Sequence, residues 1–234
     1  MTVELSVHDG VAVISLNRPE ARNALNLEMC EGLLKAVSRV GDARLVFVRG
    51  RGPVFCGGAD VKERTGKSEQ WVRERRLKAF AAYEALEALP MPCVALVHGA
   101  AIGSGAEIAA ACDFVVATPD AIFRTPEAQR GTVGATQRLP RILGKRLAKD
   151  LMFTGRDLGA EEARQAGLVS RIVTDLDGEK EKIQQLILKA SPLALKLAKR
   201  SIDQGIELDP RGAREVEIAA IEEQLASGQW MGKP

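Results

Sequence analysis

The chain has 234 residues, of which 46% are hydrophobic and 27% are charged, and its formal net charge is +2 at pH 7. This composition suits a folded protein with a sizeable core and excludes long disordered stretches. The balanced charge argues against a nucleic-acid-binding protein, because such proteins concentrate basic residues on one face or in one segment.

The first predicted elements are a hairpin, a helix and a strand. Residues 4–7 alternate weakly, residues 8–10 (His-Asp-Gly) have turn composition, and residues 11–16 read as a buried strand. A helix is expected over residues 27–40. The continuously apolar residues 45–48 then predict a strand in a sheet that is covered on both faces.

Helices and strands continue to alternate in the middle of the chain. A long helix is predicted over residues 68–89, because four apolar residues recur at helical spacing and form one face: Ala79, Tyr83, Leu86 and Leu89. A buried strand is expected at residues 94–97. A short helix at residues 107–111 and a strand at residues 114–117 follow a glycine-rich turn.

Basic residues gather most densely on the predicted long helix. They are Arg73, Arg75, Arg76 and Lys78, interrupted by Glu74. We interpret this cluster as a solvated helix face rather than as a site for a polyanion.

Only helices are predicted after residue 176, separated by the pairs Ser191-Pro192 and Asp209-Pro210. Alternating strands and helices followed by helices alone predict an α/β architecture with a helical C-terminal region.

The cysteines and the apolar runs bear on the cellular compartment. The four cysteines form no C-x-x-C pair and have no nearby histidine that would complete a zinc site: Cys30, Cys56, Cys93 and Cys112. Buried free thiols indicate a reducing compartment. No apolar run approaches transmembrane length, and the first ten residues do not resemble a signal peptide. We therefore expect a cytoplasmic protein without metal.

Two glycine-rich turns, at residues 55–60 and 99–107, each follow a predicted strand. Glycines allow the backbone to approach a ligand closely and to present its N–H groups. Two such turns that aim two N–H groups at one oxygen would form an oxyanion hole. The alternative is that both are tight turns packed on a neighbouring sheet.

Two glutamates are the candidate catalytic groups. Glu107 follows the second glycine-rich turn and precedes an almost entirely apolar segment, whereas Glu127 follows Thr125-Pro126. Taken alone, Glu107 is equally a charge at the start of a helix, and a lone Glu127 is more often such a charge than a catalytic group. Together they are able to share acid and base duties around one substrate.

Other catalytic arrangements fit poorly. The pattern G-x-G-x-x-G of dinucleotide-binding sites fails, because Ile108 stands at its sixth position. His8 lies in a predicted surface turn, and His98 reads as a structural residue at the end of a strand. Without a histidine partner, a serine triad is unsupported.

Five segments, in this order and spacing, resemble the crotonase superfamily across about residues 3 to 205. They are Asn17-Arg18-Pro19 with Asn23-Ala24-Leu25-Asn26, residues 55–63, residues 98–113, Thr136-Gln137-Arg138-Leu139-Pro140-Arg141, and residues 159–169. The resemblance implies a superhelix of repeated ββα units with a C-terminal helical trimerisation region. It divides the chain into a core for CoA-thioester binding and catalysis at residues 1–190 and a helical region at residues 191–234.

The resemblance also assigns roles to residues. It implies that the backbone N–H groups of Ala59 and Ser104 form the oxyanion hole, and that Glu107 and Glu127 are the catalytic pair. The remaining residues implied to contact the CoA part of the substrate, besides Ala59 and Ser104, are Asp60, Val61 and Lys62.

The implied activity is that of an enoyl-CoA hydratase of fatty acid metabolism, acting as a homotrimer or as a hexamer of two trimers. Coenzyme A enters as part of the substrate, and no separate cofactor, membrane or nucleic acid is expected. The alternatives are an enoyl-CoA delta-isomerase or other crotonase-type acyl-CoA enzyme, and a non-catalytic protein of this fold that binds CoA or RNA.

Three features depart from the family pattern. Ser104 stands where glycine is common, and the loop at residues 131–135 is shorter than the family's glycine-rich version. The chain also stops at residues 230–234, before the family's last helix. These departures concern the second amide donor, the acyl pocket, and CoA binding or assembly.

Overall fold

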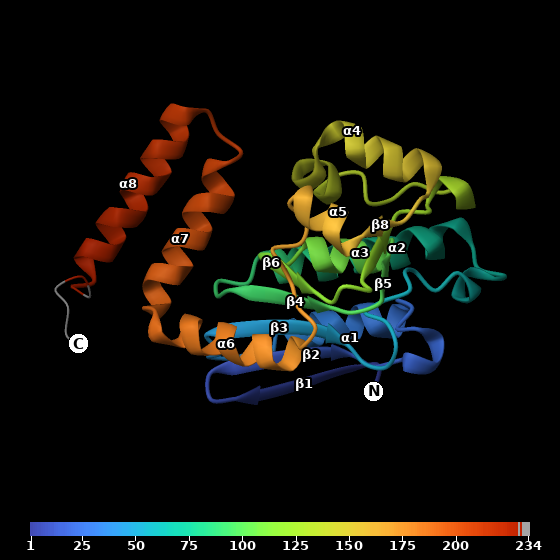
Figure 1. Cartoon of the computed structure of the whole chain (residues 1–234), viewed down its shortest axis with the longest axis horizontal. Coiled ribbons are helices and arrows are strands. Elements are labelled where there is room, and N and C mark those ends of the chain that lie inside the picture. The colour runs from blue at the N-terminus through green and yellow to red at the C-terminus, as the bar shows by residue number, and fades with distance from the viewer. Residues whose placement is uncertain (229, 231–234) are drawn as a thin grey trace.

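A six-stranded sheet forms the centre of the molecule (Figure 1). The structure is a computed structural model that describes residues 1–228 and 230. The strands lie in the order β1 (Val3–His8), β2 (Val11–Leu16), β3 (Leu45–Gly50), β4 (Cys93–Val97), β6 (Phe114–Ala117) and β9 (Arg171–Ile172). The hairpin β1–β2 is antiparallel, and every later pair in this sheet is parallel.

Helices cover both faces of this sheet. The helices α1 (Leu27–Val37), α2 (Glu69–Glu87) and α3 (Ser104–Ala110) share the larger core with Val46 and Val48 of β3. On the opposite face, Phe47 of β3 packs in a smaller core with residues of α6 (Leu176–Lys189). Because successive strand residues point to opposite faces, the continuous apolar run predicted at residues 45–48 is explained.

A smaller sheet consists of β5 (Ala100–Ile102), β7 (Ile122–Arg124) and β8 (Leu158–Gly159). The helices near it are α4 (Arg138–Thr154), which is kinked at Gly144, and α5 (Ala160–Gln165). The described chain also has three short 3₁₀ helices: η1 (Pro19–Ala21) after β2, η2 (Lys62–Arg64) after β3, and η3 (Ala128–Arg130) after β7.

The helices α7 (Pro192–Gly205) and α8 (Pro210–Ala226) pack on each other as a hairpin that stands beside the main body (Figure 1). Within the main body, Asp113 ties α7 down through an ion pair of 2.9 Å with Lys199. The predicted helical C-terminal region is therefore present, although residues 229 and 231–234 of it lie outside the described part of the chain. No helix among the described residues is long and apolar enough to cross a membrane.

Element boundaries differ from the predictions at three helices. The first helix ends at Val37 instead of residue 40, and the long helix runs over residues 69–87, with Ser68 as its N-cap. The short helix begins at Ser104, three residues before the predicted start. The glycines at 103 and 105 suggested a loop, but Gly105 is helical. A glycine stands there because a side chain would collide with the backbone of Cys56.

Candidate active site

Two adjoining cavities lie where η2, the start of α3 and the loop after β7 meet. The larger has a volume of about 440 Å³ and the smaller of about 60 Å³. Four residues line both cavities, which therefore form one site: Ala59, Arg64, Glu127 and Thr132.

The structure brings together the four residues predicted to do the chemistry. Ser104 and Glu107 line the smaller cavity together with Ala59 and Glu127. These residues come from three separate segments of the chain, and they meet because β5 and its neighbour at Cys56 form a parallel bridge beside the start of α3.

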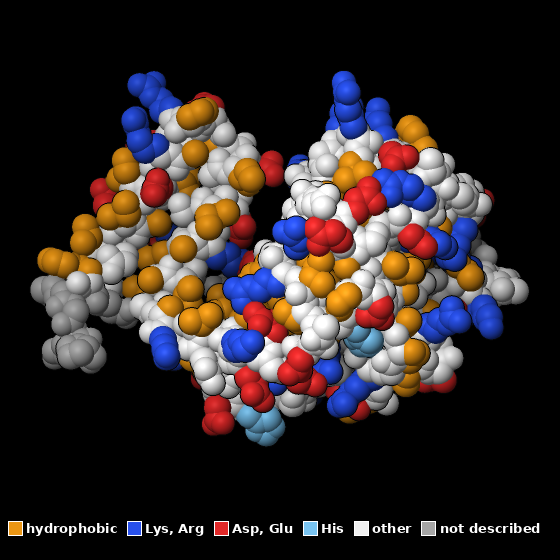
Figure 2. All heavy atoms as spheres, viewed as in Figure 1, with side chains coloured by type: hydrophobic (Ala, Val, Ile, Leu, Met, Phe, Trp, Pro, Cys, Tyr) orange, Lys and Arg blue, Asp and Glu red, His pale blue; other side chains and the backbone are white. Residues whose placement is uncertain are grey.

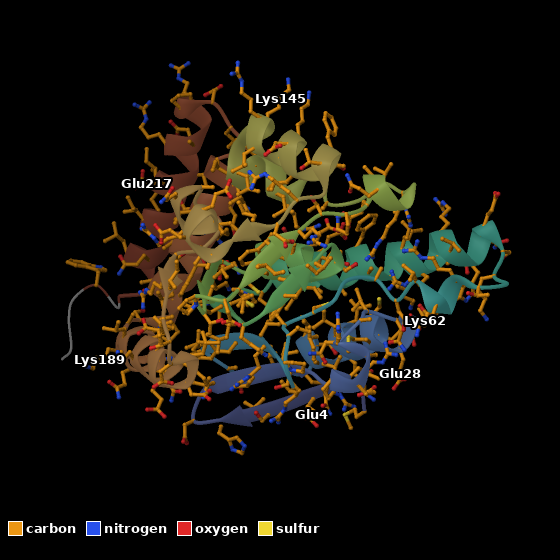
Figure 3. The ribbon with its side chains drawn as sticks, turned by 45° about the vertical axis from the view of Figure 1, so that its right-hand side comes forward. Glu4, Glu28, Lys62, Lys145, Lys189 and Glu217 are labelled. Carbon is orange, nitrogen blue, oxygen red and sulfur yellow. The ribbon has the colours of Figure 1, made fainter. Side chains whose placement is uncertain are left out.

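The remaining predicted contacts with CoA are divided between the cavity and the surface. Val61 lines the larger cavity. Asp60 forms an ion pair of 3.2 Å with Arg18, and Lys62 is exposed at the surface (Figure 3). Neither Asp60 nor Lys62 lines either cavity.

The amides of Ala59 and Ser104 are both available to a ligand. The Leu25 amide donates to the carbonyl of Gly58 at 2.7 Å, and the Asp60 amide donates to the carbonyl of Leu25 at 2.9 Å. Neither of these two hydrogen bonds uses the N–H of Ala59, which lies between Gly58 and Asp60. Ser104 is the first residue of α3, where an amide has no acceptor within the helix. Among the described residues, neither amide has a backbone acceptor.

The side chain of Ser104 is engaged away from this amide. It lies beside the phenol of Tyr83, which is buried in the core. Ser104 has no positive φ, unlike Gly103 before it. A serine is therefore compatible with a backbone donor at this position.

The substitution Ser104→Ala is expected to change kcat for the hydration proposed below by less than about tenfold, because it removes one neutral hydroxyl and keeps the amide. Steady-state kinetics beside the unmodified protein measures this. Complete loss of activity in a folded Ser104→Ala variant would place the hydroxyl, not the amide, in the reaction.

Glu107 is a buried acid whose pKa is raised towards neutral pH. Its side chain is 8% exposed, and the nearest cation is Arg138, whose Nη1 lies 3.9 Å from Oε1. Burial, together with the charge of Glu127, raises the pKa of Glu107 to about 7, although Arg138 and the backbone amide of Ala135 act in the opposite direction.

This pKa makes stability depend on pH. Because the pKa in the folded state lies above the ordinary value of 4.5, the contribution of Glu107 to stability is full below pH 4.5 and is lost as the pH rises through 7. Between pH 4.5 and 8 the loss is expected to reach up to about 3 kcal/mol. Urea denaturation of the protein and of Glu107→Gln at pH 5 and pH 8 measures it, and the variant should gain stability relative to the unmodified protein only at the higher pH. An equal difference at both pH values would contradict the raised pKa.

Glu127 is seated between two glycines. A Cβ at Gly103 would lie 2.5 Å from Glu127 Oε1, and one at Gly134 would lie 3.1 Å from its Cγ. Burial raises the pKa of Glu127, while Arg130 and Arg76 lower it. Its Oε2 is buried and has no hydrogen-bond partner among the described residues.

The structure corrects one interpretation of the sequence and adds residues that it missed. Arg75, assigned to a solvated helix face, is buried and donates to the carbonyl of Leu25, and Arg76 is half-buried and contacts Thr132. Both line the smaller cavity. Ala79, Phe80 and Tyr83 of α2 line the same cavity. Helical periodicity did not reveal the two arginines, because a pattern of apolar positions does not show that charged side chains continue the same face.

Arg138 is a further residue that sequence reasoning left without a role. It forms two hydrogen bonds of 2.6 Å with Glu87 and lies 5.5 Å from the ring centre of Tyr83. Its position inside the motif at residues 136–141 was the available signal. Held in this way, it places a fixed positive charge beside Glu107.

The family model described as enoyl-CoA hydratase/isomerase matches residues 6–229. The chain belongs to this family. It is 39% identical over 225 residues to the probable enoyl-CoA hydratase 2, mitochondrial, of Arabidopsis thaliana. The matched region covers 92% of this chain and 75% of the plant protein. The family resemblance found in the sequence is thereby confirmed.

Solved structures of the family have the same fold. The enoyl-CoA hydratase from Bacillus anthracis superposes with a TM-score of 0.89 at 35% identity, covering 95% of this chain and 90% of that one. A putative enoyl-CoA hydratase from Thermobifida fusca, in complex with acetoacetyl-CoA, superposes with a TM-score of 0.88 at 27% identity, and the match covers 97% of this chain and 95% of that one.

Proposed function

We propose that the protein adds water across the 2,3 double bond of a 2-enoyl-CoA thioester. The observation that carries this proposal is the meeting of two carboxyl groups, one buried and one half-buried, and two amides without backbone acceptors in one cavity of the described chain. An isomerase needs one carboxyl group that shuttles a proton, whereas hydration uses two groups that hold and split a water.

The proposed mechanism starts at the thioester carbonyl, whose oxygen accepts hydrogen bonds from the amides of Ala59 and Ser104. One ionised glutamate takes a proton from water as the water oxygen bonds to carbon 3, and the electrons of the double bond move onto the thioester oxygen. The other glutamate, protonated, then gives its proton to carbon 2. The pKa values of both glutamates are raised, so a pair that carries one proton suits this exchange near neutral pH.

The two amides meet the negative charge that develops on the thioester oxygen. Loss of one such donor typically lowers kcat by about 10²–10³-fold. The addition of water involves no net oxidation or reduction, so we propose that no redox cofactor takes part. We propose that no metal takes part either, because the two amides already polarise the thioester carbonyl, and that coenzyme A is only the carrier of the acyl group. The complex of the Thermobifida fusca protein supports an acyl-CoA substrate. Asp60, Val61 and Lys62 are proposed to flank the CoA part.

Crotonyl-CoA and a 3-enoyl-CoA, incubated separately with the protein, test the proposal. Hydration predicts that the conjugated absorbance of crotonyl-CoA falls and that mass spectrometry finds the product heavier by one water. If the 3-enoyl-CoA is converted to its conjugated isomer while crotonyl-CoA gains no water, the protein is an isomerase instead.

We propose, further, that the protein assembles as a homotrimer or as a hexamer of two trimers through α7 and α8. Hydrophobic side chains gather along this hairpin (Figure 2). Six of them are at least 40% exposed in the single chain: Ile202, Ile206, Leu208, Ile218, Ile221 and Leu225. Exposed apolar patches of this kind mark association surfaces.

The substitution Ile206→Asp is expected to shift the sedimentation coefficient towards that of a monomer, because burying an unpaired carboxylate in an apolar interface is costly. Val7→Asp, at an exposed apolar position of the edge strand β1, serves as the control and should leave assembly unchanged. Unchanged assembly of Ile206→Asp would exclude this surface.

All four cysteines are free and buried. On this basis we propose a reducing compartment such as the cytoplasm as the place where the protein acts.

A further inference from the structure

The larger cavity contains an arginine without an acceptor. Arg64, the last residue of η2, lines both cavities, and its Nε is buried with no hydrogen-bond partner among the described residues. A buried polar group without a partner costs free energy, and the cost is larger when the group is charged. This arginine therefore has bonding capacity that the folded chain does not use.

Its neighbours differ in this respect. Arg75 is paired with Glu63 and with the carbonyl of Leu25, and Arg76 donates to Thr132 and to the carbonyl of Val133. These bonds fix the two guanidinium groups within the protein. Of these three arginines, Arg64 is the one whose guanidinium is available to bind a ligand.

The charge around the larger cavity is positive. Glu127 is its only acidic lining residue in the described chain, whereas Arg64 and Arg130 both line it. Burial and the charges of Arg76, Arg75 and Arg130 lower the pKa of Arg64, so the protein holds this cation in an unfavourable place. An anion bound here would relieve the repulsion between these groups.

The position of the cavity indicates which part of a substrate would carry that anion. Ala59 and Glu127, which the proposed function places at the thioester carbonyl and at the reacting carbons, both line it. Val61, proposed to flank the CoA part, lines only the larger cavity, whereas Arg64 also lines the smaller cavity with Ser104 and Glu107. Arg64 therefore lies on the side of the reacting carbons. A neutral acyl chain filling this space would exclude water from Arg64 and offer no acceptor in return. A carboxylate, in contrast, matches the fork of a guanidinium with two parallel hydrogen bonds.

Resting on the proposed function, we propose that the substrate is the CoA monothioester of an unsaturated dicarboxylic acid and that Arg64 binds its free carboxylate. Arg64 is then a specificity-determining residue, and Arg130 adds favourable charge nearby.

Two saturated thioesters, which cannot be hydrated, test this by binding alone. Glutaryl-CoA carries a terminal carboxylate that the equally long valeryl-CoA lacks. Isothermal titration calorimetry of the unmodified protein is expected to show a Kd for glutaryl-CoA at least about tenfold lower than for valeryl-CoA. Equal affinities would overturn the proposal, and because no turnover is involved, that result would leave hydration of neutral enoyl-CoA untouched.

The variant Arg64→Met tests whether Arg64 causes the preference for glutaryl-CoA over valeryl-CoA. It should bring the two Kd values together, and Arg64→Lys should restore part of the difference because the charge returns without the fork. Arg73→Met, on the exposed side of α2, is the matched control and should keep the preference. A preference that survives in Arg64→Met, or an equal loss of affinity for both thioesters, would overturn the assignment, since the second result places Arg64 against the CoA part.

Discussion

Glu107→Gln and Glu127→Gln are each expected to lower kcat for the hydration of crotonyl-CoA by about 10²–10⁴-fold. Glutamine keeps the size of the side chain but is unable to take the proton from water or to give a proton to carbon 2. Glu107 is buried, Glu127 is half-buried, and burial raises the pKa of both, so loss of the charge is expected to leave the fold intact. Steady-state kinetics with circular dichroism separates loss of chemistry from loss of structure.

The control for these variants is Glu28→Gln, at an exposed position of α1 (Figure 3). It makes the same chemical change outside the cavity and should leave kcat unchanged. Full activity in both Glu107→Gln and Glu127→Gln would refute the acid/base pair. Loss in only one of them would favour a mechanism with a single proton-shuttling group.

Gly103→Ala is expected to lower kcat by at least about 100-fold, because the new Cβ occupies the place of the Glu127 carboxylate. That Cβ would lie 2.5 Å from Oε1, and the φ of +51° at Gly103 adds backbone strain. The added strain is expected to cost about 1–2 kcal/mol of unfolding free energy. Kinetics and urea denaturation of the same preparation measure both effects.

Gly41→Ala separates strain from crowding. Gly41 has a φ of +57°, close to that of Gly103, but a Cβ there would meet nothing within 4 Å. This variant should lose a similar amount of stability and keep its kcat. If Gly103→Ala were as active as Gly41→Ala, the close packing of the Glu127 carboxylate against residue 103 would have no part in catalysis.

The sequence was sufficient to predict the fold and the meeting of distant residues. The apolar strands at residues 45–48 and 94–97 and the helical face around Tyr83 are local patterns, and the structure confirms each of them. The order of motifs then placed Ala59, Ser104 and the two glutamates in one site, because a fold fixes which segments become neighbours.

The arginines of the site were not predictable in this way. Arg75 is buried because Glu63 and the carbonyl of Leu25 supply acceptors from other segments, and a helical pattern of charges does not reveal such partners. Arg64 sits in a short 3₁₀ helix with no periodicity to interpret. The pKa of Glu107 likewise depends on how deeply α3 is buried, which is a tertiary property.

A crystal structure of the protein with acetoacetyl-CoA tests the central claim most directly. The account predicts that the thioester oxygen lies about 2.7–3.1 Å from the amide nitrogens of both Ala59 and Ser104, with carbons 2 and 3 of the acyl chain facing Glu107 and Glu127. A thioester oxygen that contacts neither amide, or an acyl chain that lies outside the cavity of the two glutamates, would contradict it.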